Sequence, residues 1–336
     1  MIKQAIQAII EGNNLSEKEM IEVMRVIMEG NATDAQIAAF LTALRIKGET
    51  IEEITGAVRV MREKVTAITS PPNTVDTCGT GGDMSHTFNI STTSALVVAA
   101  CGVPVAKHGN RSVSSCCGSA DVLEALGIKI DLEPSKVEQC LESTGFGFMF
   151  APLFHPAMKY AIGPRKEMGV RTIFNILGPL TNPAGAERQV LGVFSKSLTE
   201  PLAHVLAHLG VHHAFIVHGE DGLDEITITD RTNVSELKDG KVNTYFISPD
   251  DFGFNTSEKS ELTGGDADAN AKTTIEILDG LKGPKRDIVI MNAAAALITG
   301  EKAGSFAEAA VMASEAIDSG AARDKLEEIK KISNSL

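Results

Sequence analysis

Two loops rich in glycine and hydroxyl residues lie about two dozen residues apart in this chain. The first runs from Asp76 to Asp83 (DTCGTGGD) and continues to Thr92, and the second runs from Lys107 to Ser115 (KHGNRSVSS). Each follows a short β-like run and leads into a helix-like run. Such a layout turns unpaired backbone N–H groups and a helix N-terminus toward one point, which is how proteins hold phosphate. The two loops therefore predict a ligand with more than one phosphate group.

The first loop combines close backbone approach with helix-start side chains. Glycine tolerates positive φ and lets the backbone come near an anion, and three glycines stand at positions 79, 81 and 82. Asn89, Ser91 and Thr92 stand at the predicted helix start, where side chains and N–H groups can bind phosphate oxygens. A tight turn with ordinary helix capping is the alternative. The presence of the second loop favours phosphate.

The second loop places two cations, Lys107 and Arg111, on either side of Gly109. Lysine supplies a point charge and arginine a planar fork for phosphate. Hydroxyl side chains follow at Ser112, Ser114, Ser115 and Ser119. The alternative is a solvated basic turn, but the chain has a net charge of −13, so this local concentration of positive charge favours a phosphate site.

An acidic pair, Asp224-Glu225, follows a predicted strand that ends near His218 and a turn rich in glycine and acid. Carboxylates beside bound phosphate suit Mg²⁺, which typically bridges a few carboxylates and the substrate phosphates. A surface acidic turn is the alternative reading of an isolated pair. The position after a strand, together with the two loops, favours a metal site.

Helical and α/β patterns divide the chain. The first 68 or so residues read as helices, with capping boxes at Ser16/Glu19, Thr33/Gln36 and Thr50/Glu53. A stiff connector with two prolines follows at residues 69–73, and from Thr74 onward strands alternate with helices, which indicates a largely parallel sheet. Ligands of such sheets bind beyond the carboxyl ends of the strands. The predicted strands are 75–77, 103–106, 189–194, 214–218, 243–247 and Ile288–Met291. The predicted helices are 91–101, 120–126, 201–209, 270–281 and Ser305–Ile332.

Four motifs in order, Asp76–Asp83, Lys107–Arg111 (KHGNR), Asn175–Gly185 (NILGPLTNPAG) and Asp224-Glu225, resemble the anthranilate phosphoribosyltransferase family along essentially the whole chain. The family shares its fold with pyrimidine nucleoside phosphorylases. The resemblance implies an α/β fold class, with a small all-helical domain, a larger α/β domain on a mostly parallel sheet, and an active site in the cleft between them. The implied helical domain covers residues 1–70 and is completed by about 163–185. The implied donor-binding α/β domain covers 74–162 and 186–336.

The same resemblance assigns residues to three sets, without saying which loop holds which phosphate. Phosphoribosyl pyrophosphate would be bound by Gly79, Gly82, Asp83, Thr87, Asn89, Ile90, Ser91, Thr92, Lys107, His108, Gly109, Asn110, Arg111, Ser112, Val113, Ser114, Ser115 and Ser119. Anthranilate would be bound by Gly79, His108, Asn110, Arg165 and Gly178. Mg²⁺, two ions per subunit, would be bound by Ser91, Asp224 and Glu225. No residue is expected to act as a covalent nucleophile.

The implied reaction joins phosphoribosyl pyrophosphate to the amine of anthranilate in tryptophan biosynthesis. A homodimer through the helical domain is also implied, whereas association with a glutaminase or anthranilate synthase partner is left open. A nucleoside phosphorylase is the runner-up, although two phosphate loops and an acidic pair fit a pyrophosphorylated donor better. A non-catalytic relative that binds nucleic acid is the third possibility, and it should be basic and lack the metal and acceptor residues.

Composition and charge argue against several other classes of protein, namely nucleic-acid-binding, membrane-spanning, secreted and disulfide-rich ones. The net charge of −13 argues against a broad basic face for nucleic acid. The N-terminus opens into an amphipathic pattern without a signal-peptide core, and no run is long enough to cross a bilayer, so we expect a cytoplasmic protein. Five cysteines suggest reduced thiols rather than a disulfide framework. The histidines at 204, 208 and 212 recur at helical spacing, but no HExxH-type glutamate accompanies them, so we set a metal site there aside.

Overall fold

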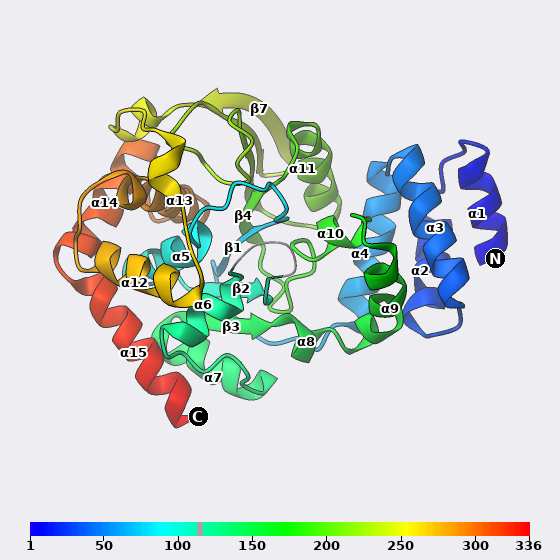
Figure 1. Cartoon of the computed structure of the whole chain (residues 1–336), viewed down its shortest axis with the longest axis horizontal. Coiled ribbons are helices and arrows are strands. Elements are labelled where there is room, and N and C mark those ends of the chain that lie inside the picture. Colours follow the sequence, from blue (N-terminus) through cyan, green and yellow to red (C-terminus); the bar gives the residue numbers. More distant parts are fainter. Residues whose placement is uncertain (113–116) are drawn as a thin grey trace.

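The computed structural model describes residues 1–112 and 117–336. A group of helices lies at one end and an α/β part surrounds a twisted sheet at the other, with the N-terminus at the helical end (Figure 1). This arrangement matches the fold class predicted from the sequence.

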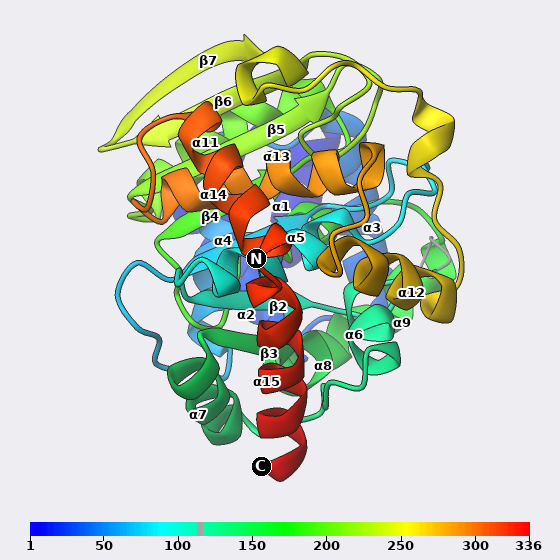
Figure 2. The same cartoon turned by 90° about the vertical axis from the view of Figure 1, so that its left-hand side faces the viewer.

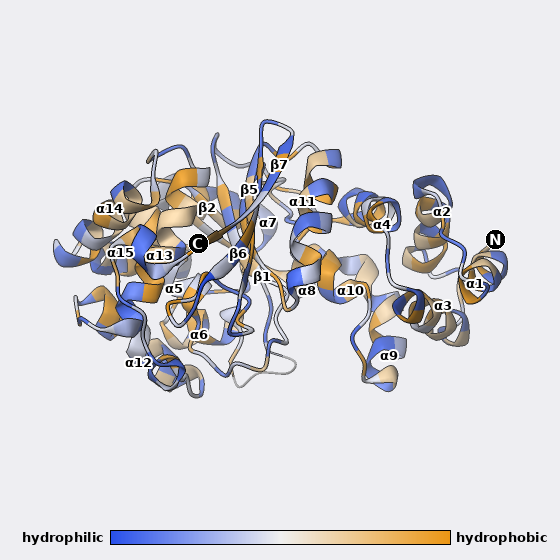
Figure 3. Ribbon diagram, turned by 90° about the horizontal axis from the view of Figure 1, so that it is seen from above, coloured by the Kyte–Doolittle hydropathy of each residue, from blue (hydrophilic) through white to orange (hydrophobic). Residues whose placement is uncertain are grey.

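Four amphipathic helices open the chain, and Figure 3 shows their mixed polar and hydrophobic faces. They are α1 (Ile2–Ile10), α2 (Glu17–Met28), α3 (Asp34–Lys47) and α4 (Ile51–Lys64). All three predicted capping boxes are present, since Ser16, Thr33 and Thr50 each accept a hydrogen bond from the backbone three residues later. The local hydroxyl–acid pattern therefore predicted these helix starts correctly.

A later segment returns to the helical end. Helix α9 (Lys159–Met168) contacts α2 and α3, and α10 (Phe174–Leu177) contacts α4. The stretch from about Gly163 to Asn182 was predicted to have helical character and no strand, and it contains the end of α9, all of α10 and no strand. The candidate acceptor residues of this segment thus stand on a different part of the molecule from the glycine loops.

The sheet has the strand order β3-β2-β1-β4-β5-β6-β7. Neighbours from β3 through β5 are parallel, and β5–β6 and β6–β7 are antiparallel. The strands are β1 (Val75–Gly79), β2 (Val105–Gly109), β3 (Phe146–Phe150), β4 (Arg188–Gly192), β5 (His213–Gly219), β6 (Thr232–Lys238) and β7 (Lys241–Ile247). Because the strands that precede both loops are parallel neighbours, both loops emerge at the same edge of the sheet.

Helices cover both faces of the sheet, and alternate strand residues enter different cores. Val190 and Val217 pack into a core with α5 (Ile90–Ala100) and α13 (Pro284–Thr299). Leu191 and Ile216 pack into a core shared with the N-terminal helices and α11 (Thr199–His208). The second core therefore joins the helical end to the sheet.

The remaining helices complete the α/β part, and Figure 2 shows α12, α14 and α15 in front of the sheet. They are α6 (Ser119–Ala125), α7 (Pro134–Thr144), α8 (Ala151–Phe154), α12 (Ala267–Leu278), α14 (Phe306–Asp318) and α15 (Ala321–Ser335). Short 3-10 helices lie at Pro156–Met158, Lys196–Leu198, Pro249–Phe252 and Lys259–Leu262. None of the helices in the described ranges is long and apolar enough to cross a membrane.

Two sequence predictions of elements were wrong. Ile288–Met291 was predicted as a strand but lies inside α13, where all four residues are completely buried. A helix that is apolar all round has no polar face to reveal its period, so a short run of it resembles a buried strand. Ser305–Ile332 was predicted as one helix, but Ser319 and Gly320 separate α14 from α15, and Gly320 has the left-handed φ of +82°.

Candidate active site at the carboxyl ends of the strands

Two paired glycines at the ends of β1 and β4 make room for Asp224. Gly79 and Gly192 are register partners in the sheet. A Cβ on Gly192 would come within 1.6 Å of the Asp224 carbonyl oxygen, and one on Gly79 within 2.7 Å of its Oδ2. Any side chain at Gly192 would therefore displace the backbone of Asp224. The absence of side chains at these strand ends fixes where the acidic pair lies.

Backbone N–H groups of the first loop hold the two acids. Gly81 donates to Asp224 Oδ2 at 2.8 Å, and Ser91, in the first turn of α5, donates to Glu225 Oε1 at 3.2 Å. The structure thus brings together Ser91, Asp224 and Glu225, which the sequence assigned to one metal site. It also places that set against the Gly79–Gly82 turn and the N-terminus of α5.

The electrostatics of this cluster suit a cation. Burial, followed by the negative charges of Asp83 and Glu225, raises the pKa of Asp224 well above its usual range. Burial raises the pKa of Glu225 to about 7, although the charge of Lys107 opposes the shift. Asp83 and Glu225 lie within electrostatic range of Asp224, but the described residues include no group of three His, Cys, Asp or Glu side chains that could hold a metal ion, so Mg²⁺ binding by Ser91, Asp224 and Glu225 stays a prediction.

Lys107 lies beneath this cluster rather than in front of it. Its side chain is 2% exposed, donates to the Thr77 carbonyl and lies 3.4 Å from Ser91 Oγ. Burial lowers the pKa of Lys107, and the charges of Asp76, Cys78 and Glu225 act in the opposite direction. From this position the ammonium group binds the backbone at Thr77 and places a positive charge near Glu225.

A buried polar network under the two loops ties the strands together. Asp76 is completely buried and accepts from the His108 N–H and from Gln189 Nε2, both at 3.4 Å. Gln189 also donates to the Pro179 carbonyl at 2.7 Å, and Asn182 donates to the Ala106 carbonyl at 2.8 Å. The NILGPLTNPAG motif is therefore bonded directly to β2 and β4.

Several residues of the first loop that are predicted to bind the donor also hold the loop in place. Thr87 pairs with Thr263 in an isolated bridge, and the Asn89 amide donates to the Cys117 carbonyl and accepts from Asn270. The side chains of Ile90 and Thr92 are buried, and the Ile90 N–H donates to the Phe88 carbonyl at 2.9 Å. Whether each of these residues binds the donor stays a prediction.

Arg165 is the residue best placed for an anionic acceptor. Its guanidinium lies 5.0 Å from the centre of the Phe174 ring, and burial lowers its pKa. No acidic side chain in the described ranges pairs with it. A mostly buried cation without a carboxylate partner is suited to receive one from a ligand. Near it in sequence, Gly178 has open space where a side chain would stand, which leaves room for a ring.

His108 and His155 form a neutral pair beside Gly178. Their Nε2 atoms are 3.1 Å apart and their ring centres 4.8 Å apart. Burial lowers the pKa of His108 to about 3, with the His155 ring adding to the shift and a hydrogen bond to the Gly178 backbone opposing it. Burial lowers the pKa of His155 to about 4. Both rings are uncharged at neutral pH, so they can line an aromatic acceptor without adding charge.

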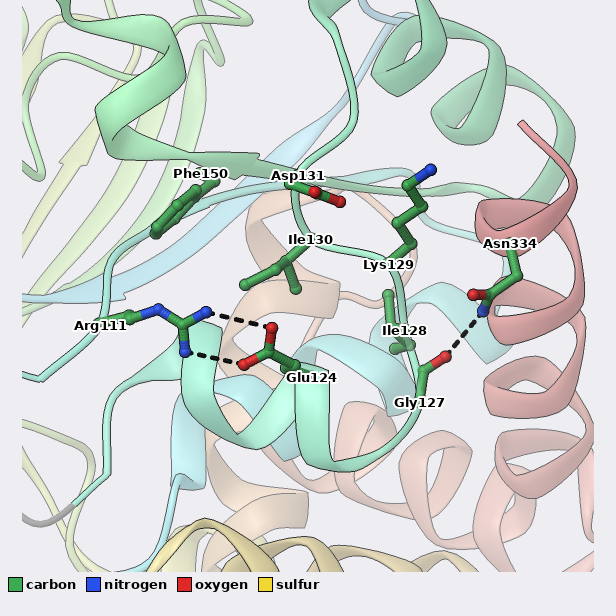
Figure 4. Close-up of a pocket in the computed structure, with 9 residues that line it drawn as sticks. All are labelled: Arg111, Glu124, Gly127, Ile128, Lys129, Ile130, Asp131, Phe150 and Asn334. Carbon is green, nitrogen blue, oxygen red and sulfur yellow. Dashed lines mark hydrogen bonds and ion pairs between the residues drawn. The ribbon is translucent and has the colours of Figure 1, made fainter.

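The second loop is engaged with α6. Arg111 bridges Asp121 and Glu124 at 2.9 and 2.8 Å, and Figure 4 shows it facing Glu124 beside a hollow of about 340 Å³. The Ser112 N–H donates to Asp121, and the Ser119 hydroxyl donates to the Asn110 carbonyl. The hollow contains none of the candidate metal ligands. Val113, Ser114 and Ser115 lie outside the described residues, and the phosphate-binding role of this loop stays a prediction.

Sequence reasoning missed His155 and Arg171. His155 stands in a turn before Pro156, where no periodic pattern marks it. Arg171 donates to the Gly82 carbonyl and lies 4.5 Å from the centre of the Phe194 ring. Its signal in the sequence was only its place between two motif residues, Arg165 and Gly178.

Comparison with known proteins defines the class. The family described as "Glycosyl transferase family, helical bundle domain" matches residues 3–65, and "Glycosyl transferase family, a/b domain" matches residues 71–323. The fold is therefore that of a glycosyl transferase with a helical bundle and an α/β domain.

Individual relatives narrow this class. Anthranilate phosphoribosyltransferase of Acetivibrio thermocellus is 57% identical over 100% of this chain and 97% of that protein. The crystal structure of the Thermus thermophilus enzyme matches with a TM-score of 0.93 at 42% identity, covering 98% of this chain and 99% of that one. The Saccharomyces cerevisiae enzyme in complex with PRPP and Mg matches with a TM-score of 0.91 at 28% identity, covering 100% and 98%, and it has also been solved with 4-fluoroanthranilate. This chain belongs to the anthranilate phosphoribosyltransferase family.

Proposed function

We propose that this enzyme transfers the phosphoribosyl group of phosphoribosyl pyrophosphate to the amine of anthranilate, giving N-(5-phosphoribosyl)anthranilate and pyrophosphate, in tryptophan biosynthesis. The observation that carries the proposal is the meeting of Asp224 and Glu225 with the Gly81 and Ser91 N–H groups at the strand ends. A site that combines acids with N–H donors suits a substrate that brings both metal and phosphate.

The donor is held mainly by backbone groups. The glycine turn at 79–82 and the N-terminus of α5 present N–H groups toward one region, and Ser91 adds a hydroxyl. Pyrophosphate leaves as an anion, so fixed N–H donors can stabilise the charge that develops on it. Lys107–Ser112, the residues at 113–115, and Ser119 supply the second set of phosphate contacts in this proposal.

Mg²⁺ is proposed to be held by Asp224, Glu225 and the Ser91 hydroxyl, with two ions per subunit. When bound it neutralises charge on the pyrophosphate leaving group. Gly79 and Gly192 leave the room in which Asp224 lies, since a Cβ at either position would clash with it.

The acceptor is held by the α9–α10 segment and the end of β2. Arg165 binds the carboxylate of anthranilate, and His108, Asn110, Gly79 and Gly178 surround the ring. An aromatic amine is uncharged at neutral pH, so no strong general base is needed. The ribose gains oxocarbenium character as pyrophosphate departs, as in other displacements at an anomeric carbon. Catalysis then depends on holding amine and C1 in line, and no covalent intermediate is required.

The proposal also covers the domains of the chain, its oligomeric state and its location in the cell. A helical domain of residues 1–70, completed by 163–185, stands beside an α/β domain of 74–162 and 186–336, with the active site in the cleft between them. The helical domain forms a homodimer, and the enzyme acts in the cytoplasm.

The test is anthranilate consumption with phosphoribosyl pyrophosphate and Mg²⁺, with matched controls that lack each one. Consumption that requires all three supports the proposal, and phosphorolysis of pyrimidine nucleosides in place of it would contradict the proposal. Replacing both acids (Asp224→Asn with Glu225→Gln) should remove most turnover. Cys78→Ser is the matched control, since Cys78 is buried and its sulfur accepts a hydrogen bond from Gln189 at 3.2 Å, which a serine oxygen can also accept. Near-normal turnover in the double variant would contradict the metal assignment.

A further inference from the structure

Arg171 joins the two halves of the candidate site. Its guanidinium donates to the Gly82 carbonyl and stacks 4.5 Å from the centre of the Phe194 ring. Guanidinium atoms lie 3.0–3.2 Å from where a Cβ on Gly82 would stand. Gly82, with a φ of +77°, thus has no side chain for two reasons, its backbone conformation and the arginine packed against it.

The turn that Arg171 contacts is strained, and its two ends are anchored elsewhere, since the Gly81 N–H donates to Asp224 and the His86 carbonyl accepts from the Gly264 N–H at 2.9 Å. Met84 and His86 have positive φ values of 57° and 53°, which cost free energy in residues other than glycine. Among the described residues, the Arg171 contact is the one hydrogen bond that joins residues 82–85 to the rest of the chain, because Ser85 bonds only to Asp83 within the turn. The turn therefore depends on Arg171 for its position.

Buried polar atoms on both sides of this contact are unsatisfied. Asp83 Oδ2 and Ser85 Oγ lie on the turn, Thr172 Oγ1 lies next to Arg171, and none of the three has a hydrogen-bond partner in the part of the chain that the structure describes. Groups of this kind are expected where a bound ligand or its water completes the site. The Arg171 contact is thus the part of this region that is already formed without substrate.

Arg171 also stands on the acceptor segment. It lies between α9, which carries Arg165, and α10, which leads to Gly178. The same short stretch of chain therefore contacts the donor turn and carries two residues proposed to hold the acceptor.

We infer that Arg171 is a positioning residue that latches the donor-binding turn at 82–85 to the acceptor-binding segment. This inference rests on the proposed function for its kinetic consequence only. Losing the latch frees the strained turn, which weakens binding of phosphoribosyl pyrophosphate. A hydrogen bond from a charged group is typically worth enough to change an equilibrium by about ten- to a hundredfold.

The first test compares amide hydrogen exchange of the substrate-free enzyme and its Arg171→Ala variant. Exchange in peptides covering residues 80–88 should rise by about tenfold or more, with the rest of the chain little changed. Arg62→Ala is the matched control. Arg62 also bridges elements through a carbonyl, donating to Leu180 at 3.0 Å, but it does not contact the turn.

The second test is steady-state kinetics. Arg171→Ala should raise KM for phosphoribosyl pyrophosphate about tenfold or more, whereas Arg62→Ala should not. Unchanged exchange at residues 80–88, an equal rise across the whole chain, or an unchanged KM would each overturn the latch. If the wild-type enzyme consumed no anthranilate, the proposed function would fail, and the exchange comparison would still decide whether the latch exists.

Discussion

Gly192 offers the sharpest test of how the strands build the acidic site. In Gly192→Ala, the new Cβ would lie 1.6 Å from the Asp224 carbonyl oxygen, where ordinary contact begins at 3.4 Å, so the backbone must withdraw by about 1.8 Å. A methyl group cannot rotate away from this contact. The variant therefore moves Asp224 without changing any proposed ligand.

The expected loss of kcat/KM in Gly192→Ala follows from how little displacement of its ligands Mg²⁺ tolerates. Mg²⁺ takes oxygen ligands at about 2.0–2.1 Å in near-octahedral geometry and adapts poorly to displaced ligands. A misplacement of about 1 Å at a reacting centre can cost about a hundredfold in rate. We expect kcat/KM to fall by at least about a hundredfold and the Mg²⁺ dependence to shift to higher concentration. The overpacking itself should lower the free energy of unfolding by about 1–3 kcal/mol.

The assay is kcat/KM for phosphoribosyl pyrophosphate over a series of Mg²⁺ concentrations, with thermal unfolding to show that the variant is folded. Gly304→Ala is the control, since its Cβ would meet only Glu308 Oε2 at an ordinary 3.5 Å. Gly79→Ala should fall between the two, because it meets the Asp224 carboxylate, which can rotate. A folded Gly192→Ala enzyme with native kcat/KM and native Mg²⁺ dependence would refute the reasoning.

Three further predictions concern cations and histidines. Arg165→Ala should raise KM for anthranilate about tenfold or more and leave donor binding unchanged, and an unchanged anthranilate KM would count against its role. The pKa values of His108 and His155 are lower in the folded chain than the usual 6.5, so protons bind the unfolded chain more readily as pH falls. The raised pKa values of Asp224 and Glu225 act in the opposite direction in both proteins, so the test is a difference. In denaturant unfolding the wild type should lose stability relative to a His108→Gln/His155→Gln variant below about pH 6.5, by at most about 1.4 kcal/mol per pH unit for each ring. Glu124→Gln should leave Arg111 held by Asp121 alone and lower KM for phosphoribosyl pyrophosphate by at most about fivefold, because the lost ion pair is exposed, and a raised KM would contradict this.

Short sequence patterns predicted the helix starts of the N-terminal part correctly. Ser16, Thr33 and Thr50 begin helices because each hydroxyl and its partner three residues later satisfy each other's backbone N–H groups. The strands before the two loops were found only in part, since the predicted 75–77 lies within β1 but the predicted 103–106 overlaps β2 only at its first two residues. Phe146–Phe150 and Thr232–Lys238 were missed, because one contains a glycine and the other is largely polar.

The site was predictable where it depends on topology. Parallel strands must end at one edge, so Ser91 and the acidic pair could be expected to meet there, and they do. Side-chain direction was not predictable. Lys107 points into the interior and Arg111 toward α6, and nothing in the run KHGNR distinguishes these directions. Arg171 could not be found because its partner, Gly82, lies 89 residues away.

The same N–H groups hold the acids and are proposed to hold phosphate. Removing the charge of the acids should therefore strengthen the binding of pyrophosphate when no metal is present. In the structure Gly81 and Ser91 donate to Asp224 and Glu225, so without metal an incoming phosphate meets both occupied donors and two acids. Since the pKa of Glu225 is raised only to about 7, this carboxyl is mostly charged in titrations at pH 8 or above, where like charges repel by more than about 1 kcal/mol at such distances near a protein surface. The double variant, Asp224→Asn with Glu225→Gln, should therefore bind inorganic pyrophosphate in EDTA at least about tenfold more tightly than the wild type, while losing the gain that Mg²⁺ gives the wild type. Calorimetric titration of both proteins, with and without Mg²⁺, makes the comparison. Weaker metal-free binding in the double variant would mean that the acids orient the loop rather than compete with phosphate for it.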